Sequence, residues 1–95
     1  MTDQVSAHML VQGRVQGVGF RYFVKNIADQ TGVTGWVRNL YDERVEIFAQ
    51  GNQENMEKFI AMIRIGPSAA LVTELSVDWF ESDNAFTKFS IAPTA

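Results

Sequence analysis

The chain has 95 residues, which suits one domain spanning residues 1–95, and its 8 basic and 11 acidic side chains give a net charge of −3 at pH 7. Cysteine is absent and histidine occurs once, so the composition excludes disulfides, thiolate zinc sites, cysteine nucleophiles and sites that need two imidazoles. The negative balance argues against a binder of duplex nucleic acid, and the lack of a membrane-length apolar run or a signal peptide favours a cytoplasmic protein.

The first third of the chain is predicted to form a strand, a loop and a helix. Apolar and polar residues alternate over residues 7–15, which indicates a strand. Two glycines interrupt the alternation within the segment 16–19 and favour a loop. Apolar residues then recur at helical spacing over residues 20–31, and Gly32 follows where a left-handed residue commonly ends a helix.

Two further strands are predicted next, with a tight connection between them. Alternation returns over residues 33–39 and again over residues 44–50, so the segment 40–43 is predicted to be a hairpin turn. Phe48 does not fit this pattern, because the alternation places it on the polar face of its strand. The two strands are therefore expected to pair directly with each other.

The last half of the chain is predicted to form a helix and two strands. Asn52 is a suitable N-cap, and Gly66-Pro67 is typical of a helix end. The core positions of this helix recur at helical spacing and are Met56, Phe59, Ile60 and Ile63. Residues 74–79 alternate as in a half-buried strand, and a short last strand is expected over residues 86–91.

The predicted order is β-α-β-β-α-β plus a short terminal strand. Because the strands alternate and are not continuously apolar, one face of the sheet should be buried and the other should meet water. This indicates an α+β fold, a ferredoxin-like two-layer sandwich in which a mostly antiparallel sheet carries two helices on one face.

A candidate anion site lies where the first strand passes through the glycine loop into the first helix. Gly17 and Gly19 allow the backbone to curl, so that successive N–H groups can point into one concavity. The first helical turn adds unpaired donors, and Arg21 adds a guanidinium that can grip two oxygens of a phosphate or carboxylate. From spacing alone, a plain tight turn with a solvated arginine remains an equal alternative.

The segment 17–23 also partly matches the aromatic consensus of RNA-recognition motifs. That consensus belongs on a strand in the middle of the chain, where its aromatic rings face bases. Here it follows the first strand, and Arg21 stands where an apolar residue is needed. We therefore expect no nucleic-acid partner.

Two long motifs resemble the signatures of the acylphosphatase family. Residues 13–21 (Gly-Arg-Val-Gln-Gly-Val-Gly-Phe-Arg) resemble its phosphate-binding loop, and residues 35–39 (Gly-Trp-Val-Arg-Asn) resemble its second signature. Val45-Glu46 and Gly66-Pro67 fit as well, so the likeness covers nearly the whole chain. One departure is the hairpin turn, which usually reads Asp-Gly in the family and reads Asp42-Glu43 here.

The resemblance implies a metal-free, cofactor-free hydrolysis of acyl phosphates. It implies that Arg21 binds the phosphoryl group together with main-chain amides, and that Asn39 orients the attacking water. The implied phosphate-binding loop consists of Gln16, Gly17, Val18, Gly19, Phe20 and Arg21. The expected partners are a small-molecule acyl phosphate and inorganic phosphate, as product and inhibitor, with no membrane and with the protein as a monomer.

The chemistry of the leaving group agrees with such a sparse site. An alkyl phosphate ester expels an alkoxide, which needs a proton or a metal ion; for scale, water has a pKa of about 15.7. An acyl phosphate expels a carboxylate, whose acid has a pKa of about 4, so it leaves unaided. An alternative function is a non-catalytic or accessory anion-binding domain of the same fold, such as hydrogenase-maturation carbamoyltransferases carry. His8 is expected to be a surface residue, and the sequence gives no signal of a partner for it.

Overall fold

Seven elements make up residues 4–95, the part of the chain that the computed structural model describes. They are β1 (Gln4–Arg14), α1 (Phe20–Thr31), β2 (Thr34–Asn39), β3 (Val45–Asn52), α2 (Gln53–Ile65), β4 (Leu71–Glu81) and β5 (Phe89–Ile91). Their order is the one that the sequence predicts. None of the helices in these residues is long and apolar enough to cross a membrane.

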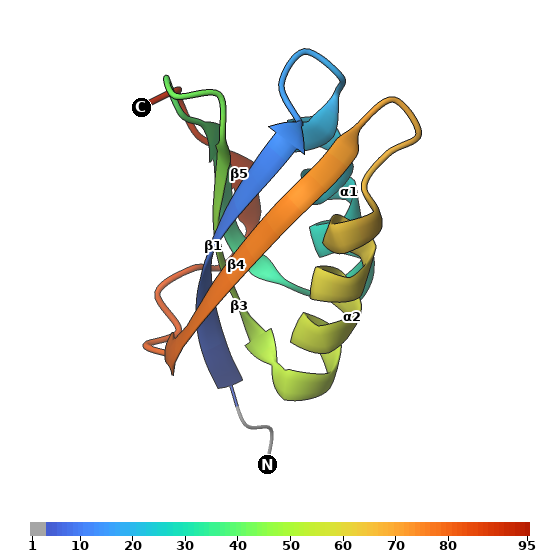
Figure 1. Cartoon of the computed structure of the whole chain (residues 1–95). Helices are drawn as coiled ribbons and strands as arrows, with labels where there is room; N and C mark the ends of the chain where they lie inside the picture. The colour runs from blue at the N-terminus through green and yellow to red at the C-terminus, as the bar shows by residue number, and fades with distance from the viewer. Residues whose placement is uncertain (1–3) are drawn as a thin grey trace.

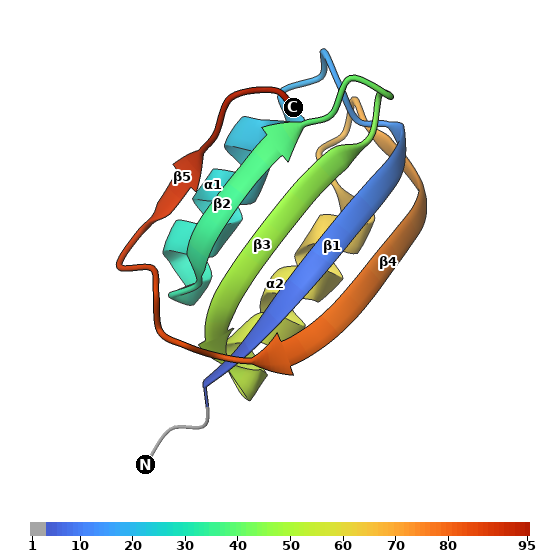
Figure 2. The same ribbon diagram turned by 90° about the vertical axis from the view of Figure 1, so that its left-hand side faces the viewer.

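The strands form one sheet in the order β4-β1-β3-β2-β5. β1 pairs antiparallel with both β3 and β4, β2 pairs antiparallel with β3, and the short β5 runs parallel to β2. Both helices pack on the same face of the sheet and leave the other face open (Figures 1 and 2). The predicted ferredoxin-like sandwich is therefore confirmed.

The core lies between the helices and the covered face of the sheet. Side chains of alternate strand residues meet the apolar stripes of the two helices there, as the two periodicities require. The core residues that are fully buried are Ala7, Met9, Val11, Val24, Ala28, Val37, Val45, Ile47, Ala49, Met56, Phe59 and Ile63. Each large apolar side chain buried in this way stabilises the fold by roughly 1.5–3 kcal/mol. Ile60 is only partly buried at the edge of this core, where full burial was expected.

The predicted helix ends are confirmed by their hydrogen bonds. Asn52 caps α2, since its side-chain oxygen accepts the main-chain N–H of Asn55 at 2.7 Å. Gly32 ends α1 in the left-handed conformation, with φ of 73°, and donates its N–H to the carbonyl of Ala28.

The strand bounds differ most from the sequence-based ones in β1, β4 and β5. β1 begins at Gln4, and β4 runs from Leu71 to Glu81, so both are longer than expected. The last strand begins at Phe89, three residues later than predicted. The chain turns before it, because the Asp83 carboxylate accepts both the Ala85 N–H at 3.1 Å and the side chain of Gln50 at 2.8 Å.

Contacts on the open face of the sheet explain why Phe48 departs from the alternation. Its ring stacks on Trp36 from β2, with the centroids 6.3 Å apart and the planes at 19°. The ring of Phe86, from the segment between β4 and β5, also lies against the Phe48 ring, with the centroids 5.8 Å apart. Phe48 is thus half-covered on a face that solvent would otherwise reach.

His8 also lies on the open face, where it has a partner that the sequence does not signal. Its Nε2 atom is 2.6 Å from one carboxylate oxygen of Glu46, whose other oxygen accepts a hydrogen bond from Arg38 Nε at 2.7 Å. Burial alone would raise the pKa of Glu46, but the hydrogen bonds from His8 and Arg38 outweigh it and hold this pKa below its usual range.

Candidate active site

The loop between β1 and α1 lies at one end of the molecule, together with the β2–β3 hairpin and the last residues of the chain (Figures 1 and 2). Two buried side chains fix the ends of this loop. Val15 directly follows β1 and Phe20 opens α1, and each is 1% exposed. The segment between them is therefore anchored to the core at both ends.

The backbone of this loop presents free donors. Gly17 and Gly19 have φ of 73° and 74°, a left-handed conformation that favours glycine, and a Cβ at either position would meet no atom within 4 Å. None of the main-chain N–H groups from Gln16 to Phe20 donates a hydrogen bond to another residue in the range 4–95. The first turn of α1 adds the positive end of its dipole, so the loop is suited to an anion.

Arg21 stands in the first turn of α1, directly after the loop. Its side chain is half-buried, and among the described residues it forms no ion pair, whereas the neighbouring Lys25 pairs with Asp29 at 2.8 Å. The guanidinium therefore has its donors available for an incoming anion beside the loop amides.

Asn39 is the last residue of β2 and pairs in register with Val45 of β3. Its side-chain oxygen Oδ1 is buried and has no hydrogen-bond partner within residues 4–95. A buried acceptor left without a partner costs about 1–3 kcal/mol, and this oxygen is not committed to a hydrogen bond with another described residue. Its main-chain carbonyl accepts the N–H of Ala95 at 3.0 Å, which ties the strand end to the last residues.

The side chain of Gln16 joins the loop to the hairpin, a contact that sequence reasoning missed. Its Nε2 donates to the carbonyl of Leu40 at 2.8 Å and to that of Arg44 at 2.9 Å. The sequence suggested a role only for the main chain of Gln16. No pattern reveals the side-chain role, because the acceptors are 24 and 28 residues away and depend on how β2 and β3 approach the loop.

Of the two acids in the hairpin turn, Asp42 is engaged with a neighbour. Asp42 accepts the main-chain N–H of Arg44 at 3.1 Å and its Nε at 2.8 Å, and these bonds from Arg44 lower the pKa of the carboxyl. Glu43 is exposed and has φ of 76°, the left-handed region, at the position where the family usually has glycine. The turn thus forms with glutamate, in a conformation that suits glycine better.

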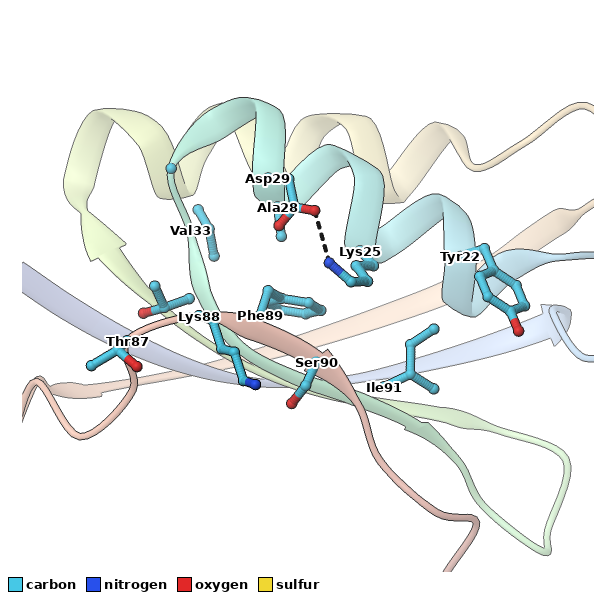
Figure 3. A pocket seen from close by; sticks show the side chains of 12 residues that line it. Tyr22, Lys25, Ala28, Asp29, Val33, Thr87, Lys88, Phe89, Ser90 and Ile91 are labelled. Atoms are coloured by element: carbon cyan, nitrogen blue, oxygen red, sulfur yellow. Dashed lines mark hydrogen bonds and ion pairs between the residues drawn. The ribbon is translucent and has the colours of Figure 1, made fainter.

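A groove of about 640 Å³ runs along α1, between this helix and β5 (Figure 3). Tyr22, at one end of it, follows Arg21 in the chain, but the groove is lined by neither Arg21 nor Asn39. The Lys25–Asp29 ion pair spans its helical side (Figure 3). Within residues 4–95, no group of three or more histidines, aspartates or glutamates is placed to hold a metal ion.

Comparisons with known proteins agree on one family. The sequence model described as Acylphosphatase matches residues 7–91. The acylphosphatase of Pyrobaculum calidifontis is 46% identical over 93 residues, which are 97% of this chain and 84% of the relative. The crystal structure of acylphosphatase from Bacillus subtilis has a TM-score of 0.90 and 41% identity, covering 93% of this chain and 98% of that one.

A second kind of match is to part of a much larger protein. The crystal structure of full-length HypF in the phosphate- and nucleotide-bound form has a TM-score of 0.90 and 30% identity. The match covers 99% of this chain but only 12% of that one. The same fold therefore occurs both as a protein of about this length and as a small part of a longer chain.

Proposed function

This chain belongs to the acylphosphatase family, and from that membership we propose how its loop, Arg21 and Asn39 act on the substrate. The enzyme cleaves the carboxyl-phosphate bond of acyl phosphates and yields a carboxylate and inorganic phosphate. In our proposal, water attacks phosphorus in line with the departing carboxylate, and no metal ion takes part.

The phosphoryl group is held by the loop and by Arg21. The observation that carries this step is the set of main-chain N–H groups from Gln16 to Phe20, which bond to no other residue in the range 4–95. In our proposal these N–H groups are held in place before the anion binds, so they stabilise charge on the phosphoryl oxygens without rearrangement. Arg21 adds a fixed positive charge with a two-pronged geometry.

Asn39 orients the attacking water. A carboxamide can accept one hydrogen bond from water through Oδ1 and donate another through Nδ2, which fixes the water in direction as well as in place. The lack of a partner for Oδ1 within residues 4–95 supports this role, since the carboxamide oxygen is not committed to another group. Positioning of this kind is what phosphoryl transfer requires most, because the transition state is loose and needs little covalent help.

The alternative of an accessory anion-binding domain is not favoured. That alternative draws on the match to HypF, of which this chain covers 12%. The curated relatives named acylphosphatase match over most of their own length, for example 98% of the protein from Pyrobaculum islandicum. We further propose that residues 1–95 act as a monomeric, cytoplasmic domain, and that the product phosphate inhibits by occupying the same loop.

The proposal is tested by following the hydrolysis of acetyl phosphate with EDTA present and in water enriched in oxygen-18. We expect turnover that EDTA does not change, with the label in inorganic phosphate, because water attacks phosphorus. Methyl phosphate serves as the matched control and should not be hydrolysed, since its alkoxide needs assistance to leave. Label in the acetate, or turnover that requires an added divalent cation, would contradict the mechanism.

A further inference from the structure

Gln16 uses its side chain in a way that no other residue of the loop does. Its carboxamide reaches out of the loop, and both hydrogens of the amide nitrogen are engaged, one with the Leu40 carbonyl at 2.8 Å and one with the Arg44 carbonyl at 2.9 Å. An amide NH₂ group has two donors, so this pair of bonds uses its full capacity. The side chain is half-buried, which limits competition from water.

The two acceptors form the base of the β2–β3 hairpin. Leu40 directly follows Asn39, and its own N–H donates to the Arg44 carbonyl at 2.8 Å, across the turn. The side chain of Gln16 therefore bonds to both sides of the hairpin, at the position next to Asn39. The main-chain N–H of Gln16 is itself one of the loop donors that have no hydrogen-bond partner in the range 4–95.

We propose that Gln16 is a positioning residue that sets the distance between the loop amides and Asn39. The inference rests on the proposed function, because it assigns phosphate to the first group and the attacking water to the second. Reacting atoms must lie about 3–3.5 Å apart and in line, and a misplacement of about 1 Å can cost about a hundredfold in rate. The carboxamide of Gln16 is the side-chain link that holds these two parts together.

The chemistry of the contact decides which variants test it. Methionine has nearly the length of glutamine and no donor, so Gln16→Met removes both bonds while it fills similar space. Gln16→Glu places a carboxylate against two carbonyl oxygens, so it replaces both attractions by repulsion. Gln30 is exposed on α1, and its side chain donates no hydrogen bond within residues 4–95, so Gln30→Met is the matched control.

Steady-state kinetics with benzoyl phosphate provide the first test. For Gln16→Met we expect kcat to fall at least about tenfold while KM changes less than about threefold, because the loop amides and Arg21 still hold the phosphoryl group. Gln16→Glu should lose at least as much, and Gln30→Met should match the wild type. A wild-type kcat in Gln16→Met, or a rise in KM without loss of kcat, would overturn the proposal.

A measurement on the unaltered protein keeps the test valid if a variant fails to fold. In NMR spectra, the side-chain amide protons of Gln16 should exchange with solvent at least about tenfold more slowly than those of Gln30. The reason is that both Gln16 protons are hydrogen-bonded, whereas those of Gln30 have no partner within residues 4–95. Equal exchange rates would show that the link does not persist and would overturn the proposal. Failure of the proposed function gives a different result: the wild type itself would then leave benzoyl phosphate intact.

Discussion

Arg21 places a permanent charge beside donors that are otherwise neutral, and this makes it the most informative residue to change. We expect Arg21→Ala to lower kcat/KM at least about a hundredfold, which is the usual effect of losing one preorganised donor that stabilises transition-state charge. Arg21→Lys should recover little, because an ammonium is a point charge and cannot form the two-pronged contact. Acyl phosphate turnover by the purified variants measures both effects.

The exposed Arg64 of α2 provides the control for this pair. Arg64→Ala removes the same charge from the exposed last turn of α2, outside the loop, so its activity should equal that of the wild type. If Arg21→Ala were to retain full turnover, the guanidinium would have no part in the reaction.

Asn39 should have a different kinetic signature from Arg21. We expect Asn39→Ala to depress kcat while inhibition by inorganic phosphate persists, since the variant loses the water-orienting amide but keeps the anion-binding loop. Inhibition curves with phosphate measure the second property directly, and Asn26→Ala on the exposed side of α1 is the control. Loss of phosphate inhibition in Asn39→Ala would make Asn39 a binding residue.

Residues differ in how far their roles could be predicted from the sequence. The loop donors and Arg21 follow from local rules, because two glycines and a helix start act within a few residues of chain. The link made by Gln16 and the pairing of His8 with Glu46 join residues 24 to 38 positions apart. Those contacts depend on strand register, which a single sequence specifies only through the hydrophobic pattern.

At the scale of elements, the hairpin turn retains strain that one substitution can remove. Glu43 occupies the left-handed region with φ of 76°, which costs a residue with a Cβ roughly 1–2 kcal/mol, whereas glycine adopts it freely. After the larger entropy of glycine in the unfolded chain is subtracted, we expect Glu43→Gly to stabilise the protein by about 0.5–1 kcal/mol. Urea unfolding monitored by circular dichroism measures the change.

Glu43→Ala is the control for the turn, since it removes the same carboxylate but keeps the Cβ and therefore the strain. It should show no gain in stability. A gain of equal size in both variants would assign the effect to charge and not to backbone conformation.

Elements with strong periodicity could be predicted with correct bounds, and elements whose ends depend on tertiary contacts could not. The helix α1 lies over the predicted residues 20–31, because its apolar stripe and Gly32 both act locally. The last strand was predicted to begin too early, because the chain first turns at Asp83. The carboxylate of Asp83 accepts hydrogen bonds from Gln50 and Ala85 there. The alternation placed Phe48 on the correct face, but its cover could not be predicted, since part of it comes from Phe86, 38 residues later.

For the molecule as a whole, a bound anion should favour the folded state over the unfolded chain. The unfolded chain has no preformed loop, so phosphate at about 100 times its Kd should stabilise the protein by about 2.7 kcal/mol. For a domain of this size each kcal/mol raises Tm by about 4–8 °C. Thermal unfolding with potassium phosphate, against potassium chloride at equal ionic strength, measures the shift.

Arg21→Ala separates specific binding from the general effect of a salt that is excluded from protein surfaces. The phosphate-dependent rise in Tm should shrink in that variant. A rise as large as that of the wild type would mean that the loop and Arg21 hold no phosphate.

The bonds that join Ala95 to the end of β2 have a practical consequence for handling the protein. The N–H of Ala95 donates to the carbonyl of Asn39 at 3.0 Å, and its carbonyl accepts the N–H of Tyr41 at 2.9 Å. β1 begins at the opposite end of the molecule and runs toward the β1–α1 loop (Figure 1). An affinity tag fused after residue 95 would therefore crowd the proposed site, whereas one fused ahead of β1 would leave it clear.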